Sequence, residues 1–217
     1  MSDFWLTLRL KKRWGFVIYR TDYSSEADWN KFLTMYEAFS NHGLPSSNFE
    51  DGRDAKSWKH MYWQNDKSQF DNATLAQLRQ HFREWVASQT FGGQLEWPES
   101  YMFMVVDKEV LDNIRPQKLE WDYSVRDEEP YLKAIDRDCP HENEDYPGWM
   151  KVPLVYLYHV YRKALKLGSM RGLCLRESDW FESETVSDEE TYLEEDESDT
   201  SLGWGASSEA VETAYGI

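Results

Sequence analysis

The sequence predicts a layered α/β fold, with a mixed sheet and alternating strands and helices, over the first 176 of 217 residues. Segments with a period of two alternate with segments of helical period, which favours this class. The chain carries 11 Trp, 13 Tyr and 10 Phe, enough aromatic surface for a large core. A ferredoxin-like α+β sandwich is the alternative that the same alternation leaves open.

The charge of the chain divides at Arg176. Residues 1–176 carry 24 basic and 26 acidic residues, whereas residues 177–217 carry 14 acidic residues and no basic one. Runs of like charge repel one another and bury too little apolar area to offset chain entropy. We therefore expect a single domain over 1–176 and a disordered acidic tail over 177–217, whose aromatic residues could anchor it to a basic surface.

The first part of the domain is predicted to contain two strands, a helix and a third strand. Alternating apolar residues predict a strand over 4–10, and an aromatic and β-branched run predicts a second over 14–20. Ser25 is expected to cap a helix that ends at 41–43, because four aromatic residues follow it at helical spacing. A loop then leads to a short strand over 58–63.

The central part is predicted to alternate in the same way. Asp71 or Asn72 is expected to open a helix with one apolar stripe, and the apolar run 101–106 predicts a strand buried on both faces. Asp107 is expected to cap a short helix that Pro116 stops.

The last part of the domain is predicted to be less regular. A candidate final strand covers 118–123, and the acid-rich segment 126–145 is expected to be a long irregular excursion. Pro153 fits the first turn of a last helix, which is expected to end at Gly168.

The candidate site lies where three predicted strands end in polar residues. If these strands run parallel, their carboxyl ends share one edge of the sheet, where α/β proteins bind ligands. Two carboxylates near a guanidinium could orient a cationic substrate or act as an acid and base pair. The expected catalytic residues are Arg20, Asp107 and Asp122, and the expected substrate-binding residues are Tyr19, Tyr23 and Glu109. The competing interpretation makes Asp107 a helix cap and Arg20 its ion-pair partner.

Common signatures of other chemistry are missing from the sequence. It contains no nucleotide-binding loop, dinucleotide fingerprint, nucleophile elbow or zinc-protease helix, so no cofactor is expected. Cys139 and His141 lie together without a second ligand pair, so no metal site is expected, and both cysteines are expected to be reduced. No apolar stretch is long enough to cross a bilayer, and we expect a cytoplasmic protein without a membrane partner.

Five short motifs stand out along residues 14–167: WGFVIYRTDY at 14–23, DW at 28–29, FxxW at 82–85, VDxExL at 106–111 and GWMKV at 148–152. Through these motifs the chain resembles a large set of short, uncharacterised intracellular proteins of filamentous fungi. The resemblance implies a fungal, cytoplasmic source and carries no activity with it.

The chain is also similar, in size and α/β pattern and not through a motif, to the fungal arginine-containing cyclodipeptide synthases. This second resemblance implies transfer of aminoacyl groups from charged tRNAs, with aminoacyl-tRNA or a small amino-acid-derived molecule as substrate. Carboxylates that could bind an arginine side chain agree with it, whereas the acidic balance of the chain does not favour tRNA. The alternative function is a non-catalytic interaction module that binds another protein through its aromatic body or its tail.

Overall fold

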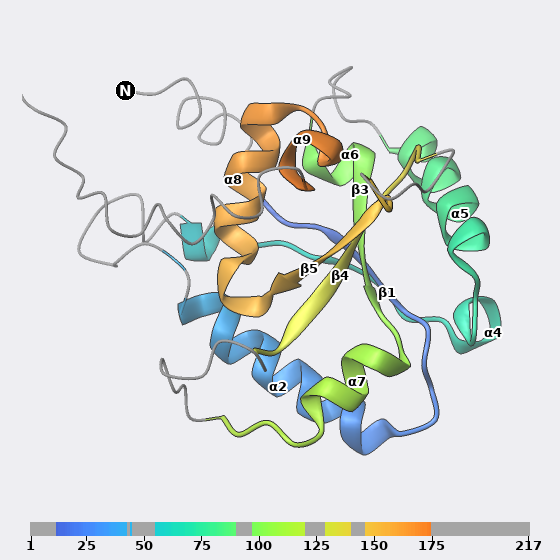
Figure 1. Cartoon of the computed structure of the whole chain (residues 1–217), viewed down its shortest axis with the longest axis vertical. Helices are drawn as coiled ribbons and strands as arrows, with labels where there is room; N and C mark the ends of the chain where they lie inside the picture. Colours follow the sequence, from blue (N-terminus) through green and yellow to red (C-terminus); the bar gives the residue numbers. More distant parts are fainter. Residues whose placement is uncertain are drawn as a thin grey trace, which may run out of the picture. The chain divides into compact units, whose positions relative to one another are not determined.

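The computed structural model describes residues 12–42, 44, 55–89, 97–119, 129–139 and 146–174 (Figure 1). The strands are β1 (Val17–Arg20), β2 (Tyr62–Gln64), β3 (Met102–Val106), β4 (Tyr131–Asp136) and β5 (Trp149–Pro153). The helices are α2 (Glu26–His42), α4 (Lys67–Phe70), α5 (Leu75–Ser88), α6 (Pro98–Tyr101), α7 (Lys108–Ile114), η1 (Leu154–Tyr156), α8 (Leu157–Leu167) and α9 (Met170–Cys174). The strand predicted over 4–10 and the acidic tail predicted over 177–217 lie outside these residues.

The five strands form one mixed sheet in the order β2-β1-β3-β4-β5. Strand β1 runs parallel to both β2 and β3, whereas β4 is antiparallel to β3 and to β5. The predicted α/β class with a mixed sheet is therefore confirmed. The ferredoxin-like alternative does not fit, because helices cover both faces of this sheet.

Two apolar layers lie on opposite faces of the sheet. Helices α2, α7, α8 and α9 bury their apolar residues on one face, and α4 and α5 bury theirs on the other (Figure 1). Consecutive residues of a strand point to opposite faces. Ile18 accordingly belongs to the first layer, whereas Val17 and Tyr19 belong to the second.

Local signals placed two of the four predicted helix starts correctly, those of α2 and α7. The Ser25 hydroxyl accepts a hydrogen bond from the Asp28 amide at 3.1 Å, as expected for the cap of α2. Helix α5 begins later than predicted, at Leu75, because Thr74 and Gln77 form a reciprocal capping box there. Asp71, one of the two predicted starts, is instead the C-cap residue of α4, and Asn72 also precedes the helix.

The central strand and helix follow the prediction closely. All five residues of β3 are buried, and β3 lies between two other strands. Helix α7 starts after Asp107 and ends at Ile114, before Pro116. Helix α8 ends at Gly168, whose φ of +66° suits a left-handed cap. Pro153 is the last residue of β5 and precedes the single turn η1. It therefore lies just before the helical segment that it was predicted to begin, which consists of η1 and α8.

The prediction of a long irregular segment over 126–145 is wrong for its central residues. Residues 131–136 form β4, which pairs with β3 and β5 on its two sides. Lys133 and Asp136 interrupt the apolar residues of this segment, so its local composition did not indicate a strand. Strand β5 was likewise not predicted. Within the candidate strand 118–123, Lys118 and Leu119 are not in a strand, and 120–123 lie outside the described residues.

None of the helices in the described part of the chain is long and apolar enough to cross a membrane.

Candidate functional site

The carboxyl ends of β1 and β3 lie at a topological switch point of the sheet. From β1 the chain passes through α2 to β2 on one side, and later through α5 to β3 on the other side. Helices α2 and α5 pack on opposite faces of the sheet. Connections that diverge in this way open a crevice at the strand ends, which is where sheets of this kind bind ligands. The switch point is therefore the candidate functional site.

Four of the six predicted site residues lie at this edge. Arg20 ends β1 and is in register with Val106, the last residue of β3, so Arg20 and Asp107 follow neighbouring parallel strands. Tyr23 lies in the segment after β1, and Glu109 lies in the first turn of α7.

The other two predicted residues are not part of the described edge. The side chain of Tyr19 lies on the α5 face of the sheet, where its hydroxyl is 2.8 Å from Nδ1 of His81. Burial there raises the pKa of Tyr19 well above its ordinary value. Asp122 lies outside the described residues.

Arg20 is fully engaged by its own surroundings and is only 3 % exposed. Its Nη1 and Nη2 donate to the two carboxylate oxygens of Glu26 at 3.2 and 2.6 Å, and its Nε donates to a backbone carbonyl. The guanidinium also lies 4.2 Å from the ring centroid of Tyr23 and 4.6 Å from that of Trp29. The interpretation that Arg20 pairs with Asp107 is wrong, because Glu26 is its partner.

Asp107 has two structural partners. Oδ1 accepts from the Val110 amide at 3.1 Å, which confirms the predicted helix cap. Oδ2 accepts from Nζ of Lys133 at 2.6 Å. Asp107 thus connects the start of α7 to β4, and it is 32 % exposed while Lys133 is 13 % exposed.

Glu109 joins β4 and β5 through three contacts. Its carboxylate lies 2.5 Å from Nζ of Lys133 and 2.9 Å from Nζ of Lys151, and it accepts from the Tyr131 hydroxyl at 2.8 Å. Hydrogen bonds from the two lysines lower the pKa of Glu109 to about 2. The contact with Glu109 also raises the pKa of Lys151.

The two lysines stand directly opposite each other on the paired strands β4 and β5. Like charges in that position repel one another, and Glu109 lies against both and offsets the repulsion. We call Asp107, Glu109, Tyr131, Lys133 and Lys151 the edge network. Sequence analysis missed its β4 and β5 members, because these strands were not predicted.

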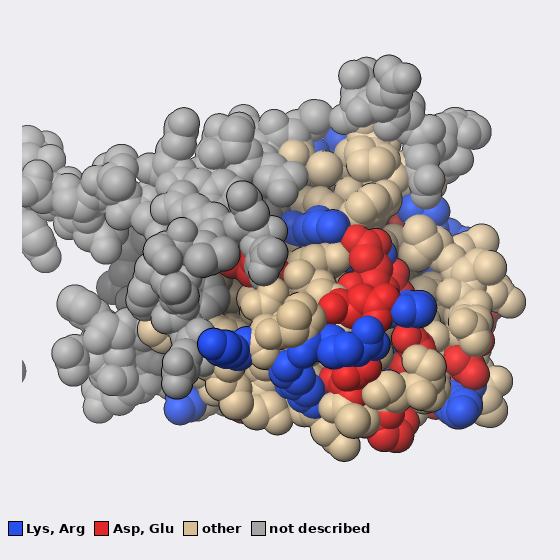
Figure 2. Space-filling view, turned by 60° about the horizontal axis from the view of Figure 1, so that its bottom comes forward, with Lys and Arg blue, Asp and Glu red and all other residues tan. Residues whose placement is uncertain are grey.

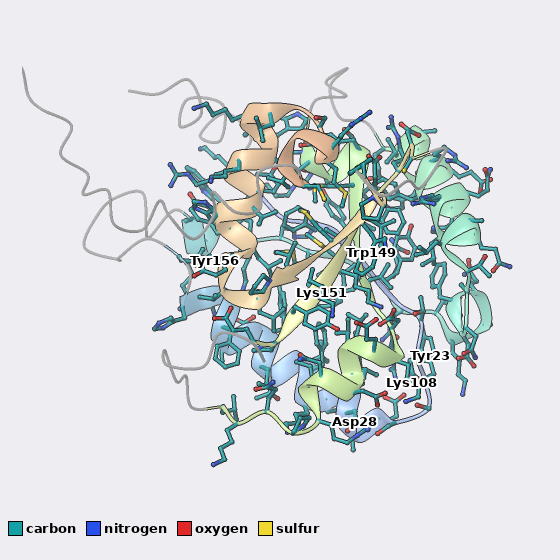
Figure 3. All side chains as sticks on the ribbon, in the orientation of Figure 1. Tyr23, Asp28, Lys108, Trp149, Lys151 and Tyr156 are labelled. Atoms are coloured by element: carbon teal, nitrogen blue, oxygen red, sulfur yellow. The ribbon has the colours of Figure 1, made fainter. Side chains whose placement is uncertain are left out.

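The edge network has a partly open side. Glu109 is 51 % exposed and Lys151 is 48 % exposed. Figure 3 labels Trp149 and Lys151 on β5 and Lys108 at the start of α7. Figure 2, which brings the end with α2 and α7 forward, shows an area of acidic side chains directly beside an area of basic ones.

The chemistry available at this edge is that of paired charges. Two carboxylates alternate with two ammonium groups, and the low pKa of Glu109 keeps this residue ionised at neutral pH. It is therefore better suited to hold a cation than to deliver a proton. The described residues include no cluster of three or more metal-ligating side chains.

Comparison of the chain with protein-family models, with curated proteins and with solved structures gave no significant match.

Proposed function

We propose that the chain is an enzyme that acts on a small amino-acid-derived substrate at the edge network. The observation that carries the proposal is the alternation of Asp107, Lys133, Glu109 and Lys151 beside the carboxyl end of β3, across β4 and β5. An α-amino acid carries an ammonium and a carboxylate a few ångströms apart. Its ammonium can pair with Glu109 and its carboxylate with Lys151, so two ion pairs with the substrate replace the one between these residues. The outer pair, Glu109 and Lys151, is the half-exposed one, and a substrate reaches it first.

The inner pair has a different role in this proposal. Asp107 and Lys133 are less exposed than the outer pair, and Asp107 also holds the start of α7. They keep Glu109 and Lys151 in place while the outer pair opens. Charge-assisted contacts of this kind orient a ligand better than neutral ones.

The specific reaction that we propose is synthesis of an arginine-containing cyclodipeptide from two aminoacyl-tRNAs. In this reaction the α-ammonium group of each aminoacyl ester first loses a proton to solvent, and the neutral α-amino nitrogen then attacks the ester carbonyl of the other. Two amide bonds form, two ester bonds break, and each tRNA leaves with its terminal hydroxyl, so no oxidant or cofactor is needed. The carboxylates of the edge network support the proposal as receivers of the two α-ammonium groups.

Two experiments test these proposals separately. The first is expression of the full chain in a heterologous host, followed by mass spectrometry of the extract for a new arginine-containing diketopiperazine. The second is a calorimetric titration of the purified protein with arginine and with arginine methyl ester. Lys151→Ala should weaken the binding of arginine, whose carboxylate pairs with Lys151 in this proposal, at least about tenfold, equivalent to about 1.4 kcal/mol, and should affect the methyl ester less.

A matched variant controls for the loss of charge. Lys108→Ala also removes one lysine from this edge, but the Lys108 side chain forms its ion pair with Asp112 on the same helix and not with a residue of the network. We expect it to bind the ligand as the natural chain does. Equal binding by both variants would remove the edge network from the proposal, and absence of the product from well-folded protein would remove the named reaction alone.

The alternative proposal is an interaction module without catalysis. Trp63 on the edge strand β2 is 37 % exposed, although its ring lies 5.2 Å from that of Tyr36 and 6.0 Å from that of Trp29. Large aromatic side chains of this kind often anchor protein partners. If the chain is such a module, truncation at Arg176 should abolish capture of a partner protein while leaving the melting temperature nearly unchanged. Trp63→Ala should also abolish capture, but it should lower the melting temperature as well, because the ring contacts with Tyr36 and Trp29 are lost.

A further inference from the structure

Strand β2 lies at one end of the sheet and pairs with β1 alone in the described part of the chain. The amide of Tyr62 donates to the carbonyl of Phe16 at 2.9 Å, so the backbone groups of Tyr62 face β1. In a parallel pair every second residue of a strand directs its N–H and C=O groups to the neighbouring strand. The backbone groups of Met61 and Trp63 therefore point away from β1, and we call them the outer edge of β2.

The outer edge of β2 offers hydrogen-bond donors and acceptors to a further strand. Among the described residues no backbone group pairs with the N–H and C=O groups of Met61 and Trp63. An edge of this kind is a template for another extended chain. A polypeptide carries both amide donors and carbonyl acceptors that match the edge, whereas the phosphate backbone of a nucleic acid carries acceptors only. The edge therefore favours an extended peptide segment over a nucleic acid.

Basic residues gather at the amino end of this edge. Trp14 forms an isolated parallel bridge with Lys59, so Lys12 and Arg13 lie beside the segment that leads into β2. Lys56 lies in that segment, and its carbonyl accepts from the Lys59 amide. Lys12 and Lys56 are exposed, and Arg13 is half-exposed. Within the described ranges no acidic side chain forms an ion pair with these three residues.

The charge changes along the length of the edge. Lys59 is neutralised by Glu37, whose carboxylate lies 3.1 Å from its Nζ. At the carboxyl end of β2 the next charged side chain is that of Asp66, which caps α4. The cations without an ion pair are therefore at the amino end only. Complementary charges fix the register and direction of a partner, so an acidic side chain is favoured at that end.

We propose that the outer edge of β2 binds an extended acidic segment of a partner protein by strand addition. Hydrogen bonds to the backbone of Met61 and Trp63 hold the segment, and its acidic side chains pair with Lys12, Arg13 and Lys56. The indole of Trp63, which is 37 % exposed, adds apolar contact. The net charge of −16 does not prevent binding, because charges beyond about 8 Å are largely screened at physiological salt.

The inference rests on the alternative proposal, in which the chain binds a protein, and is independent of the edge network. It adds the place of binding and the chemistry of the partner. The edge network lies across β4 and β5, whereas β2 is the strand at the opposite end of the sheet. The two surfaces can therefore be tested separately on the same protein.

Fluorescence anisotropy of the full chain at 150 mM salt tests the proposal. The probe is a labelled peptide of the sequence Glu-Val-Glu-Val-Glu-Val-Glu. One control peptide has Lys in place of every Glu, and the other is N-methylated at every amide, which keeps the charge and removes the backbone donors. The probe should bind at least about tenfold more tightly than either control. Hydrogen exchange at the Met61 and Trp63 amides should slow when the probe binds.

Charge reversal identifies the surface. Lys12→Glu combined with Lys56→Glu should weaken binding of the probe at least about tenfold. The control combines Lys108→Glu with Lys118→Glu, two exposed lysines at the start of α7 and after its end, with the same change of net charge. The control should retain most of the binding, and circular dichroism should show both variants folded. Arginine binding should be unchanged in the Lys12 and Lys56 variant, which separates this test from that of the edge network.

Four results would overturn the proposal. They are no binding of the probe by the natural chain, binding of either control peptide as tight as that of the probe, equal loss in the two double variants, and a dimer of the natural chain whose Met61 and Trp63 amides are already protected from exchange. The last result would assign the edge to a second copy of the chain. Capture of a partner protein that truncation at Arg176 abolishes, but that reversal of Lys12 and Lys56 leaves intact, would overturn the role of β2 alone and leave the interaction module standing.

Discussion

The contact of Glu109 with both lysines predicts a stability effect that depends on pH. Glu109→Gln keeps the shape of the side chain and removes its charge, which leaves Lys133 and Lys151 opposite each other. A pKa lowered from 4.5 to about 2 corresponds to at most about 3 kcal/mol. Because the side chain is 51 % exposed, solvent screening reduces this figure, and we expect a loss of about 1–2 kcal/mol at pH 7.

The sign of the pH dependence follows from the lowered pKa. The folded state binds this proton more weakly than the unfolded state, so the stabilisation is complete well above pH 4.5. It is lost progressively as the pH falls below 4.5 toward 2. The natural chain and the Gln variant should therefore differ in stability at pH 7, and the difference should shrink below pH 4.5 and largely vanish as the pH falls to about 2.

Urea unfolding at pH 7, 5 and 3 measures this difference, and the melting temperature at pH 7 should fall by about 2–8 °C. Glu84→Gln is the control, because Glu84 is exposed on α5 and accepts a hydrogen bond from Gln80 in the same helix. It should change stability by less than about 0.5 kcal/mol. A Glu109 variant that is as stable as the natural chain at pH 7, or whose deficit is the same at pH 7 and pH 3, would refute the reasoning.

Three further predictions concern single positions. Asp107→Ala should cost about 1 kcal/mol more than Asp107→Asn in urea unfolding, because Asn also caps a helix; equal losses would contradict the cap as the main role. Arg20→Ala should lower the melting temperature, and 50 mM methylguanidinium should restore part of it relative to 50 mM sodium, since Glu26 and two aromatic rings hold the guanidinium; no selective recovery would count against this cage. Gly15→Ala should prevent stable folding, because an added Cβ would lie 1.9 Å from a backbone carbonyl oxygen. An added Cβ at Gly168 meets open space, so Gly168→Ala should cost only the about 1 kcal/mol that its positive φ imposes. Similar melting temperatures for the two variants would contradict this reasoning.

The sequence by itself determined the elements whose signals are local. The aromatic residues of α2 recur at helical spacing after Ser25, and β3 is a short apolar run that ends in a capping Asp107. Periodicity and caps act over three or four residues, so they can be read without knowledge of the fold. The same signals predicted that Arg20 and Asp107 follow strands that share an edge, and the parallel register of β1 and β3 confirms it.

Tertiary structure alone decided which groups meet at that edge. Strands β4 and β5 exist because they pair with β3 and with each other, and their own sequences gave no strong strand signal. The sequence therefore did not predict Lys133, Lys151 and Tyr131 as site residues. Tyr19 was predicted but does not lie at the site, because neighbouring residues of a strand point to opposite faces of the sheet. Arg20 pairs with Glu26 and not with Asp107, because Glu26, six residues further along the chain at the start of α2, accepts two hydrogen bonds from the guanidinium. Contacts between residues distant in the chain depend on strand order and register, which are set by burial of the whole sheet and not by any local pattern.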